Sequence, residues 1–165
     1  MSETLPPEQV TYIMNKALTA QQKAVQRAEG TVDKYIGDAM MAFWNAPLDQ
    51  PAHETKALVC AKLIMDNMKE LNVELEKEGL PSVEIGIGIN SGKAVIGNMG
   101  SETRFDYTAI GDAVNVAARL ESGTKDLGVN LLVGEDTARF CAFELKFVDK
   151  IQVKGKEKPL SVFSF

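Results

Sequence analysis

The sequence predicts an α+β domain with a central, mostly antiparallel sheet and flanking helices. Two long segments, 7–29 and 52–77, carry apolar residues at helical spacing. Short apolar runs bounded by turn residues predict strands between and after these helices. The expected order is α-β-β-α-β-β-α-β-α-β-β. It mixes hairpins with helices, which favours α+β over a regular parallel α/β array.

Length and composition indicate one globular domain that spans residues 1–165. The chain has 45% hydrophobic and 25% charged residues, both ordinary for such a domain. A net charge of −5 argues against a nucleic-acid partner, which would need a basic face. No apolar run approaches the roughly 18 residues of a membrane span, so we expect no membrane contact from this segment. The polar start, SETLPPEQ, resembles neither a signal peptide nor a transit peptide.

The first helix has clear start and stop signals. Pro6 and Pro7 precede the helical pattern, and Gly30 follows it. Proline fits the first turn of a helix because its missing N–H would be unpaired there anyway, and glycine is favoured just past the end. These residues predict a helix over 7–29.

A hairpin is expected next. The runs 31–36 and 39–44 are strand-like, and Gly37-Asp38 between them is a two-residue turn signal, since glycine supplies positive φ. Lys34 alternates with Val32 and Ile36, which predicts that the three share one sheet face. An aspartate at the tip is a common turn residue. A lysine at an edge is often a guard against unwanted pairing, or else a donor in a ligand pocket.

The helix 52–77 ends at Gly79 and Pro81, and a strand is expected over 83–90. Its apolar side chains alternate with small or polar ones, and Gly86 and Gly88 suggest that another element packs closely against them. The run GIGINSG resembles a dinucleotide fingerprint only superficially. Its glycines have the wrong spacing and a strand follows, so a Rossmann site is rejected.

The remaining elements are shorter. We expect a strand at 94–96, a glycine-rich connection, and 107–110 leading into a helix at 112–122. A buried strand at 129–133, a short helix at 135–140 and a strand pair at 143–154 and 160–165 complete the domain. Cys60 and Cys141 are far apart and predict reduced core thiols. The lone His53 lies in a loop-like segment and predicts a solvated side chain, so a histidine-based site is not expected.

The segment IGDAVNVAARLE contains a pair that could do chemistry. Asn115 and Arg119 are four apart and therefore share one face of the expected helix. Asparagine with arginine can grip a phosphate or a ribose oxygen, because arginine is always charged and presents a planar fork. A capped surface helix with a solvated arginine is the plain alternative. The run VKGKEK near the C-terminus is either a solvated charge run or a source of one phosphate-binding lysine.

Three stretches together carry a resemblance. GTVDKYIGDAMMAFWNAP (30–47), GIGINSGKAVIGNMGS (86–101) and RFDYTAIGDAVNVAARLE (104–121), in that order, resemble the class III nucleotidyl cyclase catalytic domain. The likeness is greatest to bacterial adenylate cyclases and runs from about residue 7 to the C-terminus. It implies a ferredoxin-like nucleotidyl cyclase fold that pairs head to tail as a homodimer, with the active sites at the interface. It also implies conversion of ATP to 3′,5′-cyclic AMP and pyrophosphate with two Mg²⁺ (or Mn²⁺) ions per site.

The resemblance assigns roles at the hairpin. Asp38 matches a metal-binding aspartate, and the backbone carbonyl of Ile36 is implied as a further metal ligand. Lys34 matches the lysine that reads adenine through its N1, where guanylate cyclases usually carry glutamate. Thr108 matches the second base-reading position. Lys34 with Thr108 therefore favours ATP over GTP.

The resemblance also assigns roles in the second half of the chain. Asn115 matches the residue that orients the ribose, and Arg119 matches the arginine that stabilises charge in the transition state. Lys154 matches the lysine that binds the triphosphate, with Lys156 as a less favoured substitute. The segment from Gly97 to Tyr107 resembles an arm that reaches across the dimer.

One departure from the family pattern matters. The family's other metal-binding aspartate lies in a Phe-x-Asp-Ile-x-Gly-Phe type motif on a strand before the first helix, and this sequence has no such motif. We therefore expect a shortened cyclase that lacks its first strand and is inactive or weakly active. The alternatives are a silent nucleotide-binding or dimerising regulatory domain, and a guanylate cyclase. A cytoplasmic catalytic domain is implied, and any sensor or membrane anchor would lie outside these residues.

Overall fold

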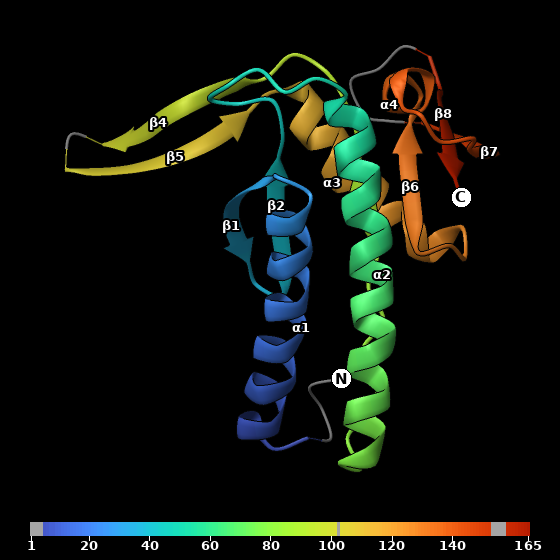
Figure 1. Ribbon diagram of the computed structural model, residues 1–165. Coiled ribbons are helices and arrows are strands. Elements are labelled where there is room, and N and C mark those ends of the chain that lie inside the picture. The colour runs from blue at the N-terminus through green and yellow to red at the C-terminus, as the bar shows by residue number, and fades with distance from the viewer. Residues whose placement is uncertain (1–4, 102, 153–157) are drawn as a thin grey trace.

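A computed structural model describes residues 5–101, 103–152 and 158–165 (Figure 1). In this part of the chain the helices are α1 (Pro7–Arg27), α2 (His53–Lys77), α3 (Asp112–Asp126) and α4 (Glu135–Phe140). The strands are β1 (Thr31–Ile36), β2 (Ala39–Phe43), β3 (Ile87–Ile89), β4 (Val95–Ser101), β5 (Arg104–Ile110), β6 (Leu131–Gly134), β7 (Lys146–Ile151) and β8 (Leu160–Ser164). The α+β class predicted from the sequence is confirmed.

The strands form a four-stranded sheet and two separate hairpins. The sheet has the order β3-β6-β8-β7, and the hairpins are β1-β2 and β4-β5. Among these pairings β3 with β6 is parallel and the others are antiparallel, so the sheet content is mostly antiparallel as predicted. Within the described ranges no helix is both long and apolar enough to cross a membrane.

The four-stranded sheet lies between α2 and α3, and β6 is its centre. All four residues of β6 are buried, so the strand is continuously apolar rather than alternating. Leu131 and Val133 pack with Leu58 of α2, whereas Leu132, between them, packs with Leu120 of α3. The period of two along a strand thus sends successive side chains into two different cores.

The two long helices α1 and α2 run side by side (Figure 1) and share a third core. Ile13, Ala24 and Val25 of α1 meet Ile64 and Leu75 of α2 there, at the helical spacing seen in the sequence. The hairpin β1-β2 packs against this core through residues that include Val32, Met40 and Trp44. The helix pair therefore supports the hairpin that carries the predicted metal-binding tip.

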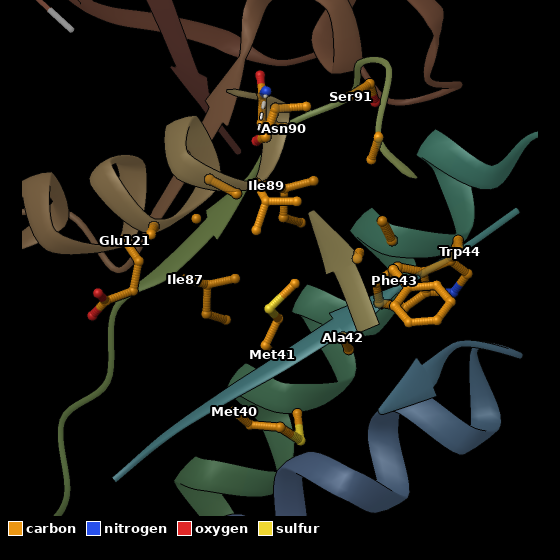
Figure 2. Close-up of a pocket in the computed structure, with 18 of the residues that line it drawn as sticks. Met40, Met41, Ala42, Phe43, Trp44, Ile87, Ile89, Asn90, Ser91 and Glu121 are labelled. Atoms are coloured by element: carbon orange, nitrogen blue, oxygen red, sulfur yellow. Dashed lines mark hydrogen bonds between the residues drawn. The ribbon is translucent and has the colours of Figure 1, made fainter. Parts of the chain in front are cut away.

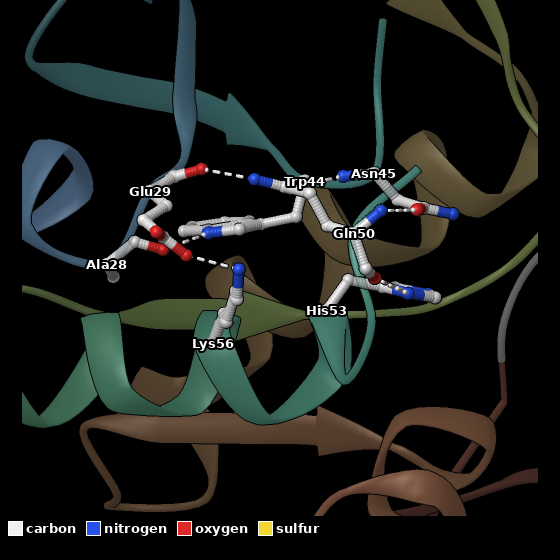
Figure 3. Close-up of polar contacts among 7 residues, drawn as sticks. All are labelled: Ala28, Glu29, Trp44, Asn45, Gln50, His53 and Lys56. Atoms are coloured by element: carbon white, nitrogen blue, oxygen red, sulfur yellow. Dashed lines mark hydrogen bonds and ion pairs between the residues drawn. The ribbon is translucent and has the colours of Figure 1, made fainter. Parts of the chain in front are cut away.

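A polar network fixes the loop after β2 (Figure 3). The Nε1 of Trp44 donates to the carbonyl of Ala28 at 2.9 Å, and Gln50 donates through Nε2 to the carbonyl of Glu29 at 2.8 Å. Glu29 also forms an ion pair with Lys56 of α2. Because the loop is bonded to the end of α1 and the start of α2, the hairpin has a defined position on the helix pair.

Gly30 has a second role besides ending the first helix. A Cβ at this position would lie 2.6 Å from the indole of Trp44, too close for any side chain. Helix α1 itself ends at Arg27, two residues before the predicted boundary. Glycine is therefore required at position 30 by the tight approach of Trp44, because the residue with left-handed backbone at this helix end is Glu29, with φ +58°.

The predicted strand 83–90 is wrong in length, since β3 covers only Ile87–Ile89. Within the described residues β3 pairs with β6 alone, so the upstream part has no ladder partner to keep it in a strand. The close packing predicted from the glycines is confirmed. A side chain at Gly88 would collide with the backbone of α3 at Ala117 and Glu121, and one at Gly86 would collide with Thr124.

The predicted glycine-rich connection after 96 is wrong. Residues 95–101 and 104–110 form the hairpin β4-β5, with Val95 opposite Ile110 at its base and Ser101 opposite Arg104 near its tip. The predicted element order therefore lacked one strand. The hairpin extends away from the body of the molecule as a long arm (Figure 1).

The first hairpin contains a β-bulge that the sequence did not indicate. Val32 pairs with Ala42 and Lys34 with Met41, so Asp33 is the extra residue. Val32 and Lys34 thus occupy consecutive positions of the ladder, and the prediction that they share one face by simple alternation is wrong. A bulge redirects the side chains beside it, which here concerns Asp33 and Lys34.

The cysteines and the histidine are mostly as expected. Both thiols are free, with Cys60 buried and Cys141 half-buried. His53 is the first residue of α2, and its side chain is only about one-third exposed, with Nε2 3.1 Å from Glu54. The prediction of a solvated loop histidine is therefore wrong, because His53 is the first residue of the helix and its ring lies between the Gln50 carbonyl and the Glu54 carboxylate.

Candidate active site

The tip of the first hairpin is an open turn. Gly37 has φ +62°, the left-handed value that favours glycine, and a Cβ there would meet nothing within 4 Å. Asp38 follows it and is exposed, and Ile36 before it is 60% exposed. The carboxylate predicted to bind metal is therefore accessible at a tight turn, with the backbone of Ile36 beside it.

Lys34 and Thr108, the two predicted base-reading residues, come together around Asp33. The Oγ1 of Thr108 donates to Oδ2 of Asp33 at 2.8 Å, and the backbone N–H of Ala109 donates to the same oxygen at 2.9 Å. The Nζ of Lys34 lies 3.3 Å from Oδ1, which accepts no hydrogen bond. One carboxylate thus holds a cation on one oxygen and a hydroxyl on the other.

The Asp33 cluster, meaning Asp33, Lys34, Thr108 and Ala109, is enclosed. The Asp33 side chain is 0% exposed and Thr108 is 5% exposed, whereas the Lys34 side chain is 40% exposed. An ionised carboxylate in such a place must be paired with charge or hydrogen bonds. Sequence reasoning missed Asp33. The available signal was an acidic residue in an apolar strand directly before a candidate lysine.

Helix α3 carries the second predicted pair. Val116 and Leu120 of this helix are buried in the core. Asn115 is exposed, and Arg119, one turn later, is half-buried. The helix begins after Gly111, whose carbonyl accepts the N–H of both Val114 and Asn115. The shared face of Asn115 and Arg119 therefore follows from helical spacing, as predicted.

A cavity of about 690 Å³ separates β2 from β3, with α2 and α3 as its other walls (Figure 2). Its lining is mostly apolar and includes Met40, Met41, Phe43, Ile87 and Ile89. In the described chain β2 pairs only with β1, and β3 only with β6. Two strand edges therefore border the cavity without ladder partners among the described residues.

The structure brings some predicted site residues together and leaves others apart. Ile36 and Asn115 both line the cavity. Lys34 and Thr108 meet at Asp33, and neither is part of the cavity lining. Lys154, with the substitute Lys156, lies outside the described residues. One predicted pair therefore lies between β1 and β5, and the other lies on α3.

The donors present do not complete the two-ion site that the resemblance implies. Among residues 5–101, 103–152 and 158–165 there is no group of three histidine, cysteine or acidic side chains that could hold a metal ion. At the hairpin tip Asp38 supplies one carboxylate, a hard oxygen ligand suited to Mg²⁺. A second acidic ligand would have to come from elsewhere.

Sequence comparison identifies relatives along the whole chain. The family model described as "Adenylate and Guanylate cyclase catalytic domain" matches residues 1–164. An adenylate cyclase of Anabaena cylindrica is 39% identical over 99% of this chain, and adenylate cyclase 1 of Rhizobium meliloti is 32% identical over 99%. The chain spans 33% and 25% of the lengths of these two proteins.

Solved structures agree with the fold. The adenylyl cyclase CyaB from P. aeruginosa has a TM-score of 0.90 at 32% identity, covering 98% of this chain and 84% of that one. The guanylyl cyclase Cya2 has a TM-score of 0.87 at 27% identity, covering 98% of this chain and 82% of that one. With the family model matching nearly every residue, the chain belongs to the adenylate and guanylate cyclase catalytic domain family.

Proposed function

We propose that this chain is an adenylate cyclase catalytic domain, built to convert ATP to 3′,5′-cyclic AMP and pyrophosphate. The family leaves the choice between ATP and GTP open, because both adenylyl and guanylyl cyclases share the fold. The observation that carries the proposal is the Asp33 cluster, which holds Lys34 beside Thr108. Lysine only donates hydrogen bonds. It therefore suits N1 of adenine, an acceptor, and not N1–H of guanine.

The reaction is an intramolecular phosphoryl transfer. The ribose 3′-oxygen forms a bond to the α-phosphorus and gives up its proton, while the bond from the α-phosphorus to the oxygen bridging to the β-phosphate breaks. Pyrophosphate leaves with that oxygen. Asn115 would orient the ribose, and the Arg119 guanidinium would offset the negative charge that spreads over the phosphoryl oxygens. Lys154 is proposed to bind the triphosphate.

Mg²⁺ or Mn²⁺ would supply charge neutralisation and a more acidic 3′-hydroxyl when bound. From the described residues only Asp38, with the backbone of Ile36, is proposed to contribute to that site. With one carboxylate at the tip, we infer that the chain in isolation is weakly active or inactive.

A homodimer is proposed because the arm β4-β5 exposes apolar side chains that a monomer leaves in water. Val95 is 65% exposed, Phe105 59% and Tyr107 42%. Apolar surface of this kind favours contact with another protein surface. A second copy, placed head to tail, would bring its α3 pair to the Asp33 cluster of the first copy. The separation of the two pairs within one chain supports this arrangement.

The open cavity is a second reason to expect impaired turnover. In the part of the chain that the structure describes, two strand edges without partners border an apolar space of about 690 Å³, and no ladder ties the hairpin to the sheet. Catalysis needs groups held within a fraction of an ångström of their productive places. Without such a ladder, side-chain contacts like that of Asp33 with Thr108 hold the hairpin relative to α3, and they would fix Asp38 less tightly than a ladder.

The test is cyclic AMP formation from ATP with Mn²⁺ or Mg²⁺. The purified chain is compared with a form extended at its N-terminus by a strand that carries the Phe-x-Asp-Ile-x-Gly-Phe motif. The proposal expects activity in the extended form and at least a hundredfold less in the chain itself, since removing one catalytic group typically costs about 10²–10³ in rate. Equal rates would overturn the proposed impairment. No cyclic AMP from either form would overturn the proposed activity.

The second candidate is a catalytically silent domain that binds nucleotide or dimerises. The single carboxylate at the hairpin tip favours it, because the base-reading cluster could remain useful without turnover. Binding of ATP by both forms, with no product from either, would support this candidate. A guanylate cyclase is disfavoured by Lys34, and cyclic GMP formed faster than cyclic AMP would reverse that judgement.

A further inference from the structure

We propose that Asp33 is a positioning residue for base selection, because it fixes the Thr108 hydroxyl as a hydrogen-bond acceptor toward the ligand and holds the Lys34 ammonium beside it. The inference rests on the proposed function, since it concerns how that same site distinguishes adenine from guanine. Asp33 itself is enclosed and would touch no substrate.

The direction of the bond between Thr108 and Asp33 follows from chemistry. A threonine hydroxyl has one hydrogen to donate and two lone pairs that accept. An ionised carboxylate only accepts, and Oδ2 of Asp33 already receives the backbone N–H of Ala109 at 2.9 Å. The hydrogen of Thr108 therefore points to Oδ2, 2.8 Å away, and the remaining lone pairs of Oγ1 are what a ligand can meet.

The hydroxyl has little freedom to leave this arrangement. Thr108 is 5% exposed and the Asp33 side chain is 0% exposed, so water cannot readily replace the bond. Threonine is also stiff at χ1, because its Cβ is branched. Breaking the bond would leave the hydroxyl hydrogen of the buried Thr108 without an acceptor, which is costly and therefore favours the bonded arrangement.

The other oxygen of the same carboxylate organises Lys34. Its Nζ lies 3.3 Å from Oδ1, an oxygen that receives no hydrogen bond from any described group. The bulge at Asp33 allows neighbouring residues 33 and 34 to approach one another in this way, where a regular strand would point them to opposite faces. Because the Lys34 side chain is 40% exposed, it can still donate to a ligand.

The cluster therefore presents one donor, from Lys34, and one acceptor, from Thr108. Adenine offers the complement on its pairing edge: N1 accepts and the 6-amino group donates. Guanine offers the reverse, with an N1–H donor and an O6 acceptor. A Thr108 hydroxyl free to rotate could donate to O6 and tolerate guanine, so the carboxylate is what makes threonine selective. A protein that makes the correct hydrogen bonds to one base typically binds it about 5- to 150-fold more tightly than a base that mismatches those bonds.

Two substitutions separate the effect of Asp33 on Thr108 from its effect on Lys34. Asp33→Ala frees the Thr108 hydroxyl and removes the partner of Lys34. Asp33→Asn keeps an oxygen toward Thr108, because the N–H of Ala109 requires an acceptor at that point. Asparagine therefore preserves the acceptor role of Thr108 and loses only the charge beside Lys34. A matched control is Asn72→Ala, which removes a half-buried side chain of α2 that is bonded to the backbone of Val83 and not to the Asp33 cluster.

The measurement is calorimetric titration of the full chain and its variants with ATP and with GTP in the presence of Mn²⁺, alongside thermal unfolding. We expect the wild-type protein to bind ATP more tightly than GTP. In Asp33→Ala the ratio of the two affinities should fall about tenfold. Asp33→Asn should bind both nucleotides more weakly, with the ratio unchanged. Asn72→Ala lowers the unfolding temperature without changing the ratio. An unchanged ratio in Asp33→Ala, or equal losses of preference in both Asp33 variants, would overturn the proposal.

Purine riboside triphosphate, which lacks the 6-amino group, gives a test that needs no folded variant. The wild-type chain should bind it about tenfold more weakly than ATP, because no 6-amino group is present to donate a hydrogen bond to Oγ1 of Thr108. Equal affinity would show that Thr108 does not read the amino group and would overturn the proposal. The proposed function fails separately, if the wild-type chain binds neither nucleotide or prefers GTP.

Discussion

The hydroxyl of Thr108 donates to the carboxylate of Asp33 at 2.8 Å, across 75 positions of sequence. This bond joins the base of the arm to the first hairpin, and the second oxygen of the same carboxylate lies 3.3 Å from Nζ of Lys34. Two residues suited to read one purine are therefore held by one enclosed acid. The consequences extend to stability as well as to nucleotide choice.

Lys34→Glu alone should destabilise the protein by about 1–3 kcal/mol, because it places a second carboxylate beside the fully enclosed Asp33. The double variant Lys34→Glu/Asp33→Asn should recover most of that loss. Urea unfolding of both variants measures the difference.

The control for this pair is Lys69→Glu. Lys69 also lies beside an acid, 3.5 Å from Asp66, but its side chain is 79% exposed. An exposed pair contributes little, so the cost should stay below about 1 kcal/mol. Equal losses in Lys34→Glu and Lys69→Glu would show that enclosure of Asp33 is unimportant.

Gly88→Ala should unfold at a markedly lower temperature, with a loss of about 3 kcal/mol or more. A Cβ at Gly88 would meet the backbone of α3 at Ala117 and Glu121, and backbone atoms cannot move aside as a flexible side chain can. Gly97→Ala is the matched control in a strand, since a Cβ there meets nothing within 4 Å. Similar melting curves for the two variants would contradict the close packing of α3 on β3.

Stability should decline above pH 9 because of Cys60. Burial raises the pKa of this thiol from 9.0 to about 12. The folded protein therefore keeps the proton that the unfolded chain releases, and stability that is complete below pH 9 is lost between pH 9 and about 12. The slope approaches about 1.4 kcal/mol per pH unit.

The variant Cys60→Ala tests this directly. It is less stable than the wild-type protein at pH 7, because a buried sulfur is removed. The difference between the two proteins should narrow between pH 9 and pH 10.5 in denaturant titrations. A difference that stays constant over that range would rule out Cys60 as the source of alkaline sensitivity.

Phe105→Asp should weaken dimer formation by at least about tenfold while leaving unfolding of the monomer nearly unchanged. Phe105 is 59% exposed on the arm, and a charge there would have to be desolvated in an interface. Phe140→Asp is the control, because Phe140 is 64% exposed on α4, well away from the arm (Figure 1). Sedimentation equilibrium measures both. Loss of the dimer in Phe140→Asp but not in Phe105→Asp would place the interface elsewhere.

The sequence predicted best those elements whose periodicity is set by burial. Helix α2 was expected at 52–77 and covers His53–Lys77, because one face is buried along its whole length. A buried strand was expected at 129–133 and β6 covers Leu131–Gly134, with its side chains in cores on both faces. In both cases the chemistry of each residue reports directly on its local surroundings.

The sequence failed where the outcome depends on distant neighbours. Several residues of the arm β4-β5 are exposed, so no alternating pattern of burial marked its strands, and its glycines suggested a loop. Strand β3 is short because its upstream part lacks a partner. Asp33 was not identified from the sequence, because its role depends on Thr108 and Ala109, which only the fold brings near it.

The most direct test of the account is a crystal structure of the chain with a non-hydrolysable ATP analogue. The account predicts hydrogen bonds of about 2.7–3.2 Å from Nζ of Lys34 to N1 of adenine and from its 6-amino group to Oγ1 of Thr108. The bond from Thr108 to Asp33 should persist. Adenine bound away from Lys34 and Thr108, or Thr108 turned away from Asp33 to donate to the base, would contradict it.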